Sequence, residues 1–241
     1  MNCSFNEAQQ LAQTYRDQSS ALQTERSEVI ICPSFDALAS CAGIVANSPI
    51  KIGAQTVSCY DLGAHTGQVS AQSLSEIGCT HTIIGHSERR QECHETNEEI
   101  AQKVRQLITH NITPIICIGE TENEYKAGVG AAVLERQLEP LLPILQEKPG
   151  LQPIIAYEPI YAIGTGIVPE PEYLIKMLTA IKENLKINLP DLKYTLIYGG
   201  SVAESTIPSL RSIEEIQGFL IGSASLDFQK FQKIVSLWYT R

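Results

Sequence analysis

The chain has 241 residues, of which 43% are hydrophobic and 19% charged, and its mean hydropathy is −0.05. This composition is that of a folded globular protein and excludes a disordered or fibrous chain. The formal net charge is −9, and no block of like charge interrupts the sequence. We therefore expect no nucleic acid and no membrane surface as a partner, because both attract basic faces.

The sequence shows no pattern of a targeting signal and no metal-binding spacing of cysteines. The segment from Met1 has no basic stretch followed by an apolar run, and no run approaches the roughly 18 apolar residues of a membrane-spanning helix. The seven cysteines include no C-x-x-C pair, and no histidines lie near them at zinc-site spacing. We expect a cytoplasmic protein with reduced thiols and no metal site.

Short apolar runs alternate with longer amphipathic segments along the chain. The apolar runs predict strands at 28–32, 50–54, 81–85, 113–118, 152–157, 194–198 and 218–221. Leucine or isoleucine returns every three or four residues in the predicted helices at 7–22, 98–110, 131–145, 172–185 and 227–238. The strand interiors are continuously apolar, which is typical of parallel strands covered on both faces.

This alternation predicts repeated βα units, arranged either as a closed barrel or as an open doubly wound sheet. No linker or shift in composition divides the chain, so we expect one domain over 1–241. A closed barrel needs one strand more than the seven predicted, and the shortfall lies at the start, where helical periodicity follows Asn2 at once. The open sheet lacks a G-x-G-x-x-G motif after an early strand, which favours the barrel.

In parallel barrels the functional residues follow the carboxyl ends of the strands. His86 follows the predicted strand 81–85, and Glu158 follows the strand 152–157. Partial burial would raise the pKa of Glu158 towards that of a useful general base. Two simpler interpretations stay open, because a strand-end histidine is often a structural hydrogen-bonding residue and a strand-end glutamate can be an ordinary ion-paired rim residue.

Small residues follow three strand ends. After Glu158, the segment 159–166 has a proline at its start and glycines at its end, a composition typical of a lid. Gly199, Gly200 and Ser201 follow one of the last two predicted strands, and Gly222 and Ser223 follow the other. Such turns expose backbone N–H groups, so they predict a phosphate site, although ordinary glycine turns remain the alternative.

Four motifs in this order resemble the signatures of the triosephosphate isomerase family, and the resemblance covers almost the whole chain. They are IGHSERR at 84–90, CIGET at 117–121, AYEPIYAIGTG at 156–166 and YGGSV at 198–202. The resemblance implies an α/β fold, the (β/α)8 TIM barrel, with the first strand largely missing from this chain. It also implies an isomerase that interconverts dihydroxyacetone phosphate and glyceraldehyde 3-phosphate without a cofactor.

The resemblance also implies roles for individual residues. Glu158 would remove the proton next to the carbonyl group, and a neutral His86 would polarise the carbonyl oxygen. Asn2 would lie beside the reacting oxygens, and Glu88 and Cys117 would support the site. The phosphate group would be held by backbone amides of four residues, which are Gly164, Ser201, Gly222 and Ser223.

The chain departs from the family pattern at several positions. Ser4 stands where the family has a lysine, and loss of that fixed positive charge would lower the rate by roughly a hundredfold to a thousandfold. Tyr161 replaces a tryptophan, Pro169 stiffens the second lid hinge, and Ser223 replaces a glycine. These changes keep open an inactive homologue that binds a phosphate ligand or a protein partner. A different phosphosugar isomerase or an aldolase is a weaker alternative, since no strand-end lysine is placed for a Schiff base.

One more match concerns assembly. The segment 64–68 resembles a long family loop whose tip enters the neighbouring subunit, with Gln68 in place of a glutamate. One protruding loop and one receiving groove per subunit close under twofold symmetry. The resemblance therefore implies a homodimer formed through the loop at Thr66, whereas an ordinary polar surface loop would be expected without it.

Overall fold

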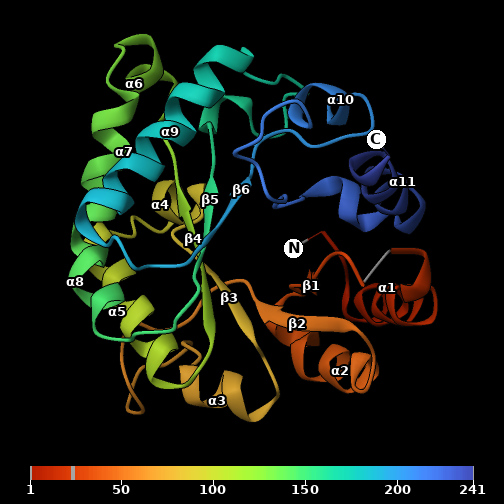
Figure 1. Ribbon diagram of the computed structural model, residues 1–241. Coiled ribbons are helices and arrows are strands. Elements are labelled where there is room, and N and C mark those ends of the chain that lie inside the picture. The colour runs from red at the N-terminus through yellow and green to blue at the C-terminus, as the bar shows by residue number, and fades with distance from the viewer. Residues whose placement is uncertain (1, 23–24, 241) are drawn as a thin grey trace.

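The computed structural model of the chain describes residues 2–22 and 25–240. The described residues form a six-stranded parallel sheet whose strands lie in chain order and curl into a half-barrel (Figure 1). The strands are β1 (Val29–Ile31), β2 (Ile50–Ala54), β3 (His81–Ile84), β4 (Thr113–Ile118), β5 (Ile154–Tyr157) and β6 (Thr195–Tyr198). The fold is thus the α/β barrel architecture that the sequence predicts, and the described residues supply six of its eight strands, where the sequence predicts seven.

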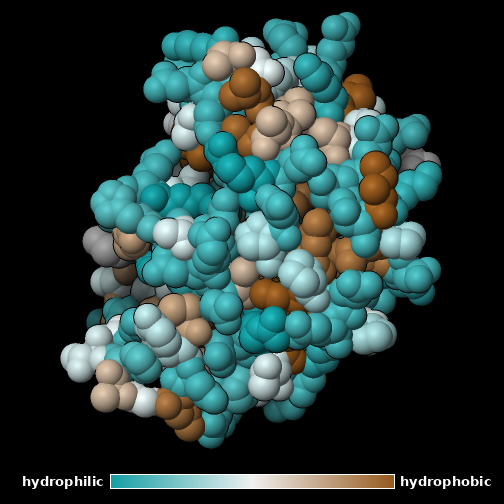
Figure 2. Space-filling view, turned by 90° about the vertical axis from the view of Figure 1, so that its left-hand side faces the viewer, coloured by the Kyte–Doolittle hydropathy of each residue, from teal (hydrophilic) through white to brown (hydrophobic). Residues whose placement is uncertain are grey.

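Helices follow the strands and cover the outer side of the sheet (Figure 1). The α-helices are α1 (Phe5–Asp17), α2 (Phe35–Val45), α3 (Ala71–Glu76), α4 (Ser87–Glu92), α5 (Asn97–Thr109), α6 (Glu122–Lys126), α7 (Gly130–Leu138), α8 (Leu142–Gln146), α9 (Pro171–Asn188), α10 (Ile207–Leu210) and α11 (Phe228–Tyr239). Short 3₁₀ turns span Ser19–Leu22, Glu139–Leu141, Ile160–Ala162 and Ser223–Leu226. The outward surface on the side of α7 and α8 is predominantly hydrophilic (Figure 2), as expected for helices that bury only one stripe.

Three of the predicted elements differ clearly from the structure. The predicted helix 7–22 is divided into α1, which ends at Asp17, and a separate 3₁₀ turn at Ser19–Leu22. The predicted helix 131–145 is divided into α7, a 3₁₀ turn and α8, because Pro140 and Pro143 each lie in the first turn of a new segment. Proline has no N–H to donate, so it begins helices and interrupts those that run through it. The predicted strand 218–221 is reduced to one bridge between Phe219 and Tyr198.

Apolar residues on the two faces of the sheet form two separate clusters. The larger cluster lies between the sheet and its helices and includes residues from Ala8 in α1 to Ile234 in α11. The smaller cluster consists of Ile115, Cys117, Ala156 and Ile197, packed against Ile30, Ile83, Ile154 and Leu220. Alternate residues of β4 enter the two clusters, so both faces of this strand are apolar, as its continuous hydrophobic run indicates.

The half-barrel is open on the side of β1. In the part of the chain that the structure describes, β1 pairs with β2 alone. Across this side the first and last helices meet, since the ring of Tyr15 packs edge-on against Phe228 and Phe231 at centroid distances of 5.3 and 5.2 Å. No α-helix among residues 2–22 and 25–240 is long and apolar enough to cross a membrane.

Candidate active site

Glu158 is a buried carboxylate at the carboxyl end of β5. Its side chain is 2% exposed and points towards the residues that follow β3. One carboxylate oxygen, Oε2, accepts a hydrogen bond from the Ser87 backbone N–H at 3.0 Å. The other, Oε1, lies 3.2 Å from Nε2 of His86. The structure therefore brings together the two residues that the sequence suggested as general base and polarising group.

Two glycines enclose Glu158. A Cβ atom on Gly119, directly after β4, would overlap the backbone carbonyl of Glu158. A Cβ atom on Gly199, directly after β6, would lie 2.9 Å from Cγ of Glu158. Only residues without a side chain allow the neighbouring strand ends to approach this closely. The glycines of the CIGET and YGGSV motifs thus allow the strand ends next to Glu158 to pack closely against it.

Burial controls the acidity of Glu158. Loss of contact with water is the largest influence and raises the pKa of the carboxyl group above its ordinary value. His86, the Ser87 N–H, the thiol of Cys117 and the charge of Arg90 lower the pKa and offset part of this rise. The carboxylate is therefore more basic than an exposed glutamate, which suits proton removal from a weak carbon acid.

His86 is held at the point where β3 passes into α4. Gly85 has a φ of +68°, a conformation that favours glycine, and it turns the chain so that His86 begins α4. Nδ1 of His86 lies 3.8 Å from the carboxylate of Glu88, which is largely exposed. The imidazole itself is 26% exposed, so a ligand can reach part of the ring.

The side chain of Arg90 holds the turn between β3 and α4 through hydrogen bonds. Its guanidinium donates to the carbonyl of Gly85 at 2.7 Å, to the side-chain oxygen of Asn97 at 2.7 Å and to the carbonyl of Cys117 at 3.2 Å. The group therefore ties the ends of β3 and β4 to α5. Arg90 is part of the IGHSERR motif, but its position in the sequence does not indicate this role.

The segment 159–166, predicted to be a lid, follows β5 and is hydrogen-bonded to the turn after β6. The hydroxyl of Ser201 donates to the carbonyl of Ala162 at 2.5 Å and accepts from the N–H of Gly166 at 3.0 Å. Gly164 and Gly166 have φ values of +69° and +76°, which explains the glycines in this segment. The hydroxyl of Ser201 is thus hydrogen-bonded to the segment 159–166, a contact that the sequence does not predict.

Glu120, which follows β4, is bound by two tyrosines, and two further tyrosines form an aromatic cluster with them. The hydroxyls of Tyr157 and Tyr173 donate to the same oxygen of Glu120 at 2.9 and 3.1 Å. Tyr161 stacks on Tyr125 at a centroid distance of 4.3 Å. Burial is the main cause that raises the pKa of Glu120. Tyr161, which stands where the family has tryptophan, therefore fills an aromatic position at the start of the lid.

The other predicted phosphate donors lie at the turn before the last helix. Gly222 precedes the 3₁₀ turn Ser223–Leu226, so the first N–H groups of this turn have no partner within it. A Cβ atom on Gly222 would meet no atom within 4 Å, which indicates an open approach. The binding of a phosphate group by Gly164, Ser201, Gly222 and Ser223 stays a prediction.

Asn2 and Ser4 lie in a different environment from Glu158. Both are described by the structure, and Asn2 is exposed. Ser4 is the N-cap of α1, where its hydroxyl donates to the Glu7 carboxylate at 2.7 Å and accepts from the Glu7 N–H at 3.5 Å. The serine that replaces the family lysine therefore serves to begin a helix.

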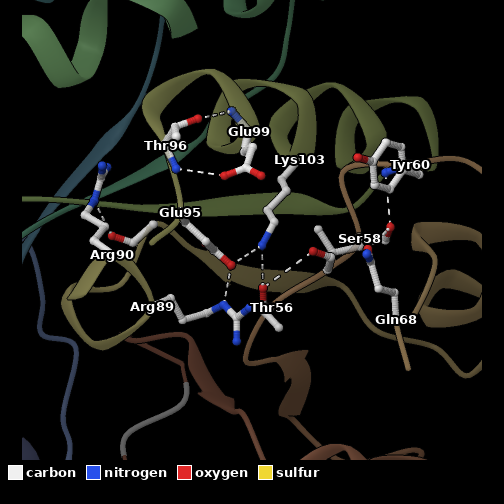
Figure 3. A network of polar contacts seen from close by, with 12 residues as sticks. Thr56, Ser58, Tyr60, Gln68, Arg89, Arg90, Glu95, Thr96, Glu99 and Lys103 are labelled. Atoms are coloured by element: carbon white, nitrogen blue, oxygen red, sulfur yellow. Dashed lines mark hydrogen bonds and ion pairs between the residues drawn. The ribbon is translucent and has the colours of Figure 1, made fainter. Parts of the chain in front are cut away.

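The loop that follows β2 projects from the sheet. Its base is closed by the Ser58 N–H, which donates to the Val69 carbonyl at 2.8 Å, and by the Ser58 hydroxyl, which donates to Gln68 at 2.6 Å. Beside this base, buried Glu95 binds both Arg89 and Lys103, and Lys103 donates to Thr56 (Figure 3). A partly buried ion-pair network thus connects the loop to α4 and α5, whereas Thr66 in the loop is exposed.

A parallel half-barrel with a buried glutamate and a histidine at its carboxyl edge places the chain among α/β-barrel enzymes. Comparison with known proteins gives the family. A sequence model described as triosephosphate isomerase matches residues 1–238, and the chain belongs to this family of isomerases.

Curated relatives agree over most of their length. A triosephosphate isomerase of Wolbachia sp. subsp. Brugia malayi is 42% identical over 209 residues, which cover 87% of this chain and 83% of the relative. A triosephosphate isomerase of Clostridium botulinum (strain Langeland) is 36% identical over 240 residues, covering 98% and 95%. One of Chlamydia muridarum is 38% identical over 239 residues, covering 98% and 87%. The resemblance drawn from the four motifs is therefore confirmed.

Proposed function

We propose that this chain is a triose-phosphate isomerase that interconverts dihydroxyacetone phosphate and glyceraldehyde 3-phosphate, a step of glycolysis and gluconeogenesis. The observation that carries the proposal is the contact between Glu158 and His86 at the carboxyl edge of the sheet. A buried carboxylate of raised pKa lies 3.2 Å from an imidazole that a ligand can reach. Proton transfer between adjacent carbons needs this combination of a base and a hydrogen-bond donor.

In the proposed reaction Glu158 takes a proton from the carbon next to the carbonyl group. The C–H bonding electrons form a carbon–carbon double bond, and the carbonyl oxygen gains negative charge that the N–H on Nε2 of His86 stabilises. A proton passes to that oxygen, a proton leaves the neighbouring hydroxyl, and Glu158 returns its proton to the adjacent carbon. Atoms and electrons balance without a redox cofactor, because the substrate is oxidised at one carbon and reduced at the other.

The remaining predicted ligands would hold the substrate in place. We propose that the phosphate group binds backbone amides of Gly164, Ser201, Gly222 and Ser223 and that Asn2 lies beside the reacting oxygens. The contacts of Ser201 with Ala162 and Gly166 support a lid that docks on the same turn. Glu88 and Cys117 flank His86 and Glu158, respectively, as supporting residues.

The role of Ser4 separates this proposal from its main alternative. A lysine in the site would supply a fixed charge worth roughly a hundredfold to a thousandfold in rate, and Ser4 cannot supply it. We propose that the enzyme is active but slow. The alternative, an inactive homologue that binds a phosphate ligand or protein partner, is favoured by the helix-capping role and exposure of Ser4.

Turnover of glyceraldehyde 3-phosphate by the purified protein tests the proposal. Wild type is expected to exceed the Glu158→Gln variant by about 10²-fold to 10⁴-fold, the range typical of a general base. Glutamine keeps an oxygen for the Ser87 N–H, so the fold is retained and the comparison reports on proton transfer. Ser4→Lys is expected to raise kcat/KM. Equal rates for wild type and Glu158→Gln would reject the isomerase in favour of the inactive homologue.

We further propose that the chain acts as one domain and as a homodimer in the cytoplasm. One apolar cluster extends from α1 to α11, which supports a single folding unit.

The loop after β2 exposes Tyr60 and Leu62, and Tyr60 stacks on His65 at a centroid distance of 4.2 Å, so a stiff and partly apolar loop is available to a second copy. The seven cysteines are free, as in a reducing compartment. Sedimentation velocity is expected to give the mass of a dimer, and a monomer at micromolar concentration would contradict it.

A further inference from the structure

Gln137 is a buried glutamine of α7 that hydrogen-bonds to the backbone at the end of β4. Its Oε1 accepts from the Gly119 N–H at 2.8 Å, and its Nε2 donates to the Gly119 carbonyl at 3.0 Å. The pairing of β4 with β5 ends one residue earlier, at Ile118 and Tyr157. The side-chain amide therefore provides the donor and the acceptor that a neighbouring strand would otherwise offer to Gly119.

Gly119 in turn lies directly against Glu158. Its Cα is so close to the Glu158 carbonyl that no Cβ atom could be placed between them. The residues on both sides of Gly119 also bind this segment. The Glu158 N–H donates to the Ile118 carbonyl at 2.8 Å, and the Ile160 N–H donates to the Glu120 carbonyl at 3.1 Å. The backbone of Glu158 thus packs against residues 118–120 and is hydrogen-bonded to them.

From this chain of contacts we infer that Gln137 is a positioning residue that sets the place of the Glu158 carboxylate by holding Gly119. The inference rests on the proposed function, in which Glu158 transfers the proton. Gly119 has no side chain to pack and a wide choice of backbone angles, so its position depends on its two hydrogen bonds. Displacement of a catalytic group by about 1 Å can cost roughly 10²-fold in rate, even when the change lies away from the reacting atoms.

Two substitutions at Gln137 separate positioning from packing. In Gln137→Met the side chain has nearly the same length but leaves both the N–H and the carbonyl of Gly119 without a partner. In Gln137→Glu one carboxylate oxygen still accepts from the N–H, but the other faces the Gly119 carbonyl and repels it unless the carboxyl group is protonated. The second variant therefore keeps one hydrogen bond and makes the other dependent on pH.

Gln217 provides the matched control. Its Oε1 accepts a hydrogen bond at 2.7 Å from the Leu196 backbone N–H in β6, so Gln217→Met also removes a side-chain amide from a strand. Leu196 belongs to the larger apolar cluster and not to the site. Any loss of rate that comes only from a weaker sheet should therefore be seen in both methionine variants.

The experiment measures kcat, KM and Tm for wild type, Gln137→Met, Gln137→Glu and Gln217→Met with glyceraldehyde 3-phosphate. For Gln137→Met we expect kcat to fall about 10-fold to 100-fold with little change in KM, whereas Gln217→Met keeps the wild-type kcat. The rate of Gln137→Glu, divided by the wild-type rate at the same pH, should rise as the pH is lowered. Equal kcat losses in the two methionine variants, or a pH-independent ratio for Gln137→Glu, would overturn the inference.

A second readout does not depend on turnover. The pKa of Glu158 can be followed by ¹³C NMR of the labelled carboxyl group in all four proteins. Because this pKa depends on burial and on the distance to His86, Gln137→Met should shift it and Gln217→Met should not. If wild type shows no isomerase activity, the proposed function fails while this titration still tests the positioning. An unchanged pKa in Gln137→Met would reject the role of Gln137 by itself.

Discussion

The carboxyl edge around Glu158 and the segment that begins the chain differ sharply in how they hold their polar groups. Glu158 is buried, and its carboxylate, its N–H and its carbonyl are each in contact with another strand end. Ser4, by contrast, is exposed, and its hydrogen bonds among the described residues go to Glu7 and Ala8 of its own helix. Long-range contacts therefore fix the proposed base, while local contacts hold the position that has lost the family lysine.

Alanine substitutions at two glycines, one beside Glu158 and one in a helix away from it, should show the largest effect of this close packing. Gly119→Ala places a methyl group on the Glu158 carbonyl, and backbone atoms cannot move aside as a flexible side chain can. We expect the free energy of unfolding to fall by at least about 3 kcal/mol. Gly43 lies in α2, where a Cβ atom would meet nothing within 4 Å. Gly43→Ala should raise stability by about 0.5–1 kcal/mol.

Urea unfolding of both variants measures these changes. A loss below about 1 kcal/mol in Gly119→Ala would show that the strand ends separate easily, and the close packing around Glu158 would then not be rigid. Turnover of any folded Gly119→Ala protein should be low as well, because the added methyl group displaces the base.

The pH dependence of kcat/KM should next show how strongly burial affects the ionisation of Glu158. Glu158 acts as a base only when ionised, and burial raises its pKa. Activity should therefore increase with pH through a limb that lies above about 4.3, the ordinary value for glutamate. Below that limb, the rate should fall about tenfold per pH unit.

Cysteine variants test which contacts set the pH at which this limb of the kcat/KM profile lies. The Cys117 thiol lowers the pKa of Glu158, so Cys117→Ala should move the limb to higher pH. Cys41 is an equally buried thiol that instead contacts the Ala8 carbonyl, and Cys41→Ala should leave the limb in place. Parallel shifts in both variants would mean that the limb reports on general stability and not on Glu158.

The smallest effect is expected at Ser4. Ser4→Ala removes the N-cap of α1 and should lower stability by about 1 kcal/mol without changing kcat. Thr96→Ala removes the equivalent cap of α5, which has the same reciprocal contacts through Glu99, and should cost a similar amount. Thermal unfolding and steady-state kinetics measure both. A drop in kcat for Ser4→Ala alone would show that the serine takes part in the reaction.

Much of the fold could be predicted from short sequence patterns, because the residues within a strand or helix largely determine where it begins and ends. The strand 50–54 and the strand 113–118 were predicted with the bounds that the structure has, since continuous apolar runs between turns define buried parallel strands. Prolines 140 and 143 explain why the helix predicted at 131–145 is interrupted. The strand prediction at 218–221 was wrong for a different reason, because strand pairing depends on a neighbour, and among the described residues the segment forms one isolated bridge, between Phe219 and Tyr198.

The site was predictable only in part. His86 and Glu158 could be found because strand-end positions and family motifs mark them, and the structure brings them together, although their roles remain untested. Gln137 could not be found this way, because a glutamine within an amphipathic helix looks like an ordinary surface residue. Its contacts join residues 18 positions apart, and nothing in the local sequence indicates that it turns inward.

The contact of Tyr15 with α11 has a consequence for how the protein is made. The Tyr15 hydroxyl donates to the Ser225 carbonyl at 2.9 Å, across 210 positions of sequence. Helix α1 is made well before α11, so the ring of Tyr15, which is buried in the folded protein, stays without its partner rings until α11 has been made. Contacts of such long range slow folding. Helix α1 should thus depend on chaperones until α11 is available to pack against it.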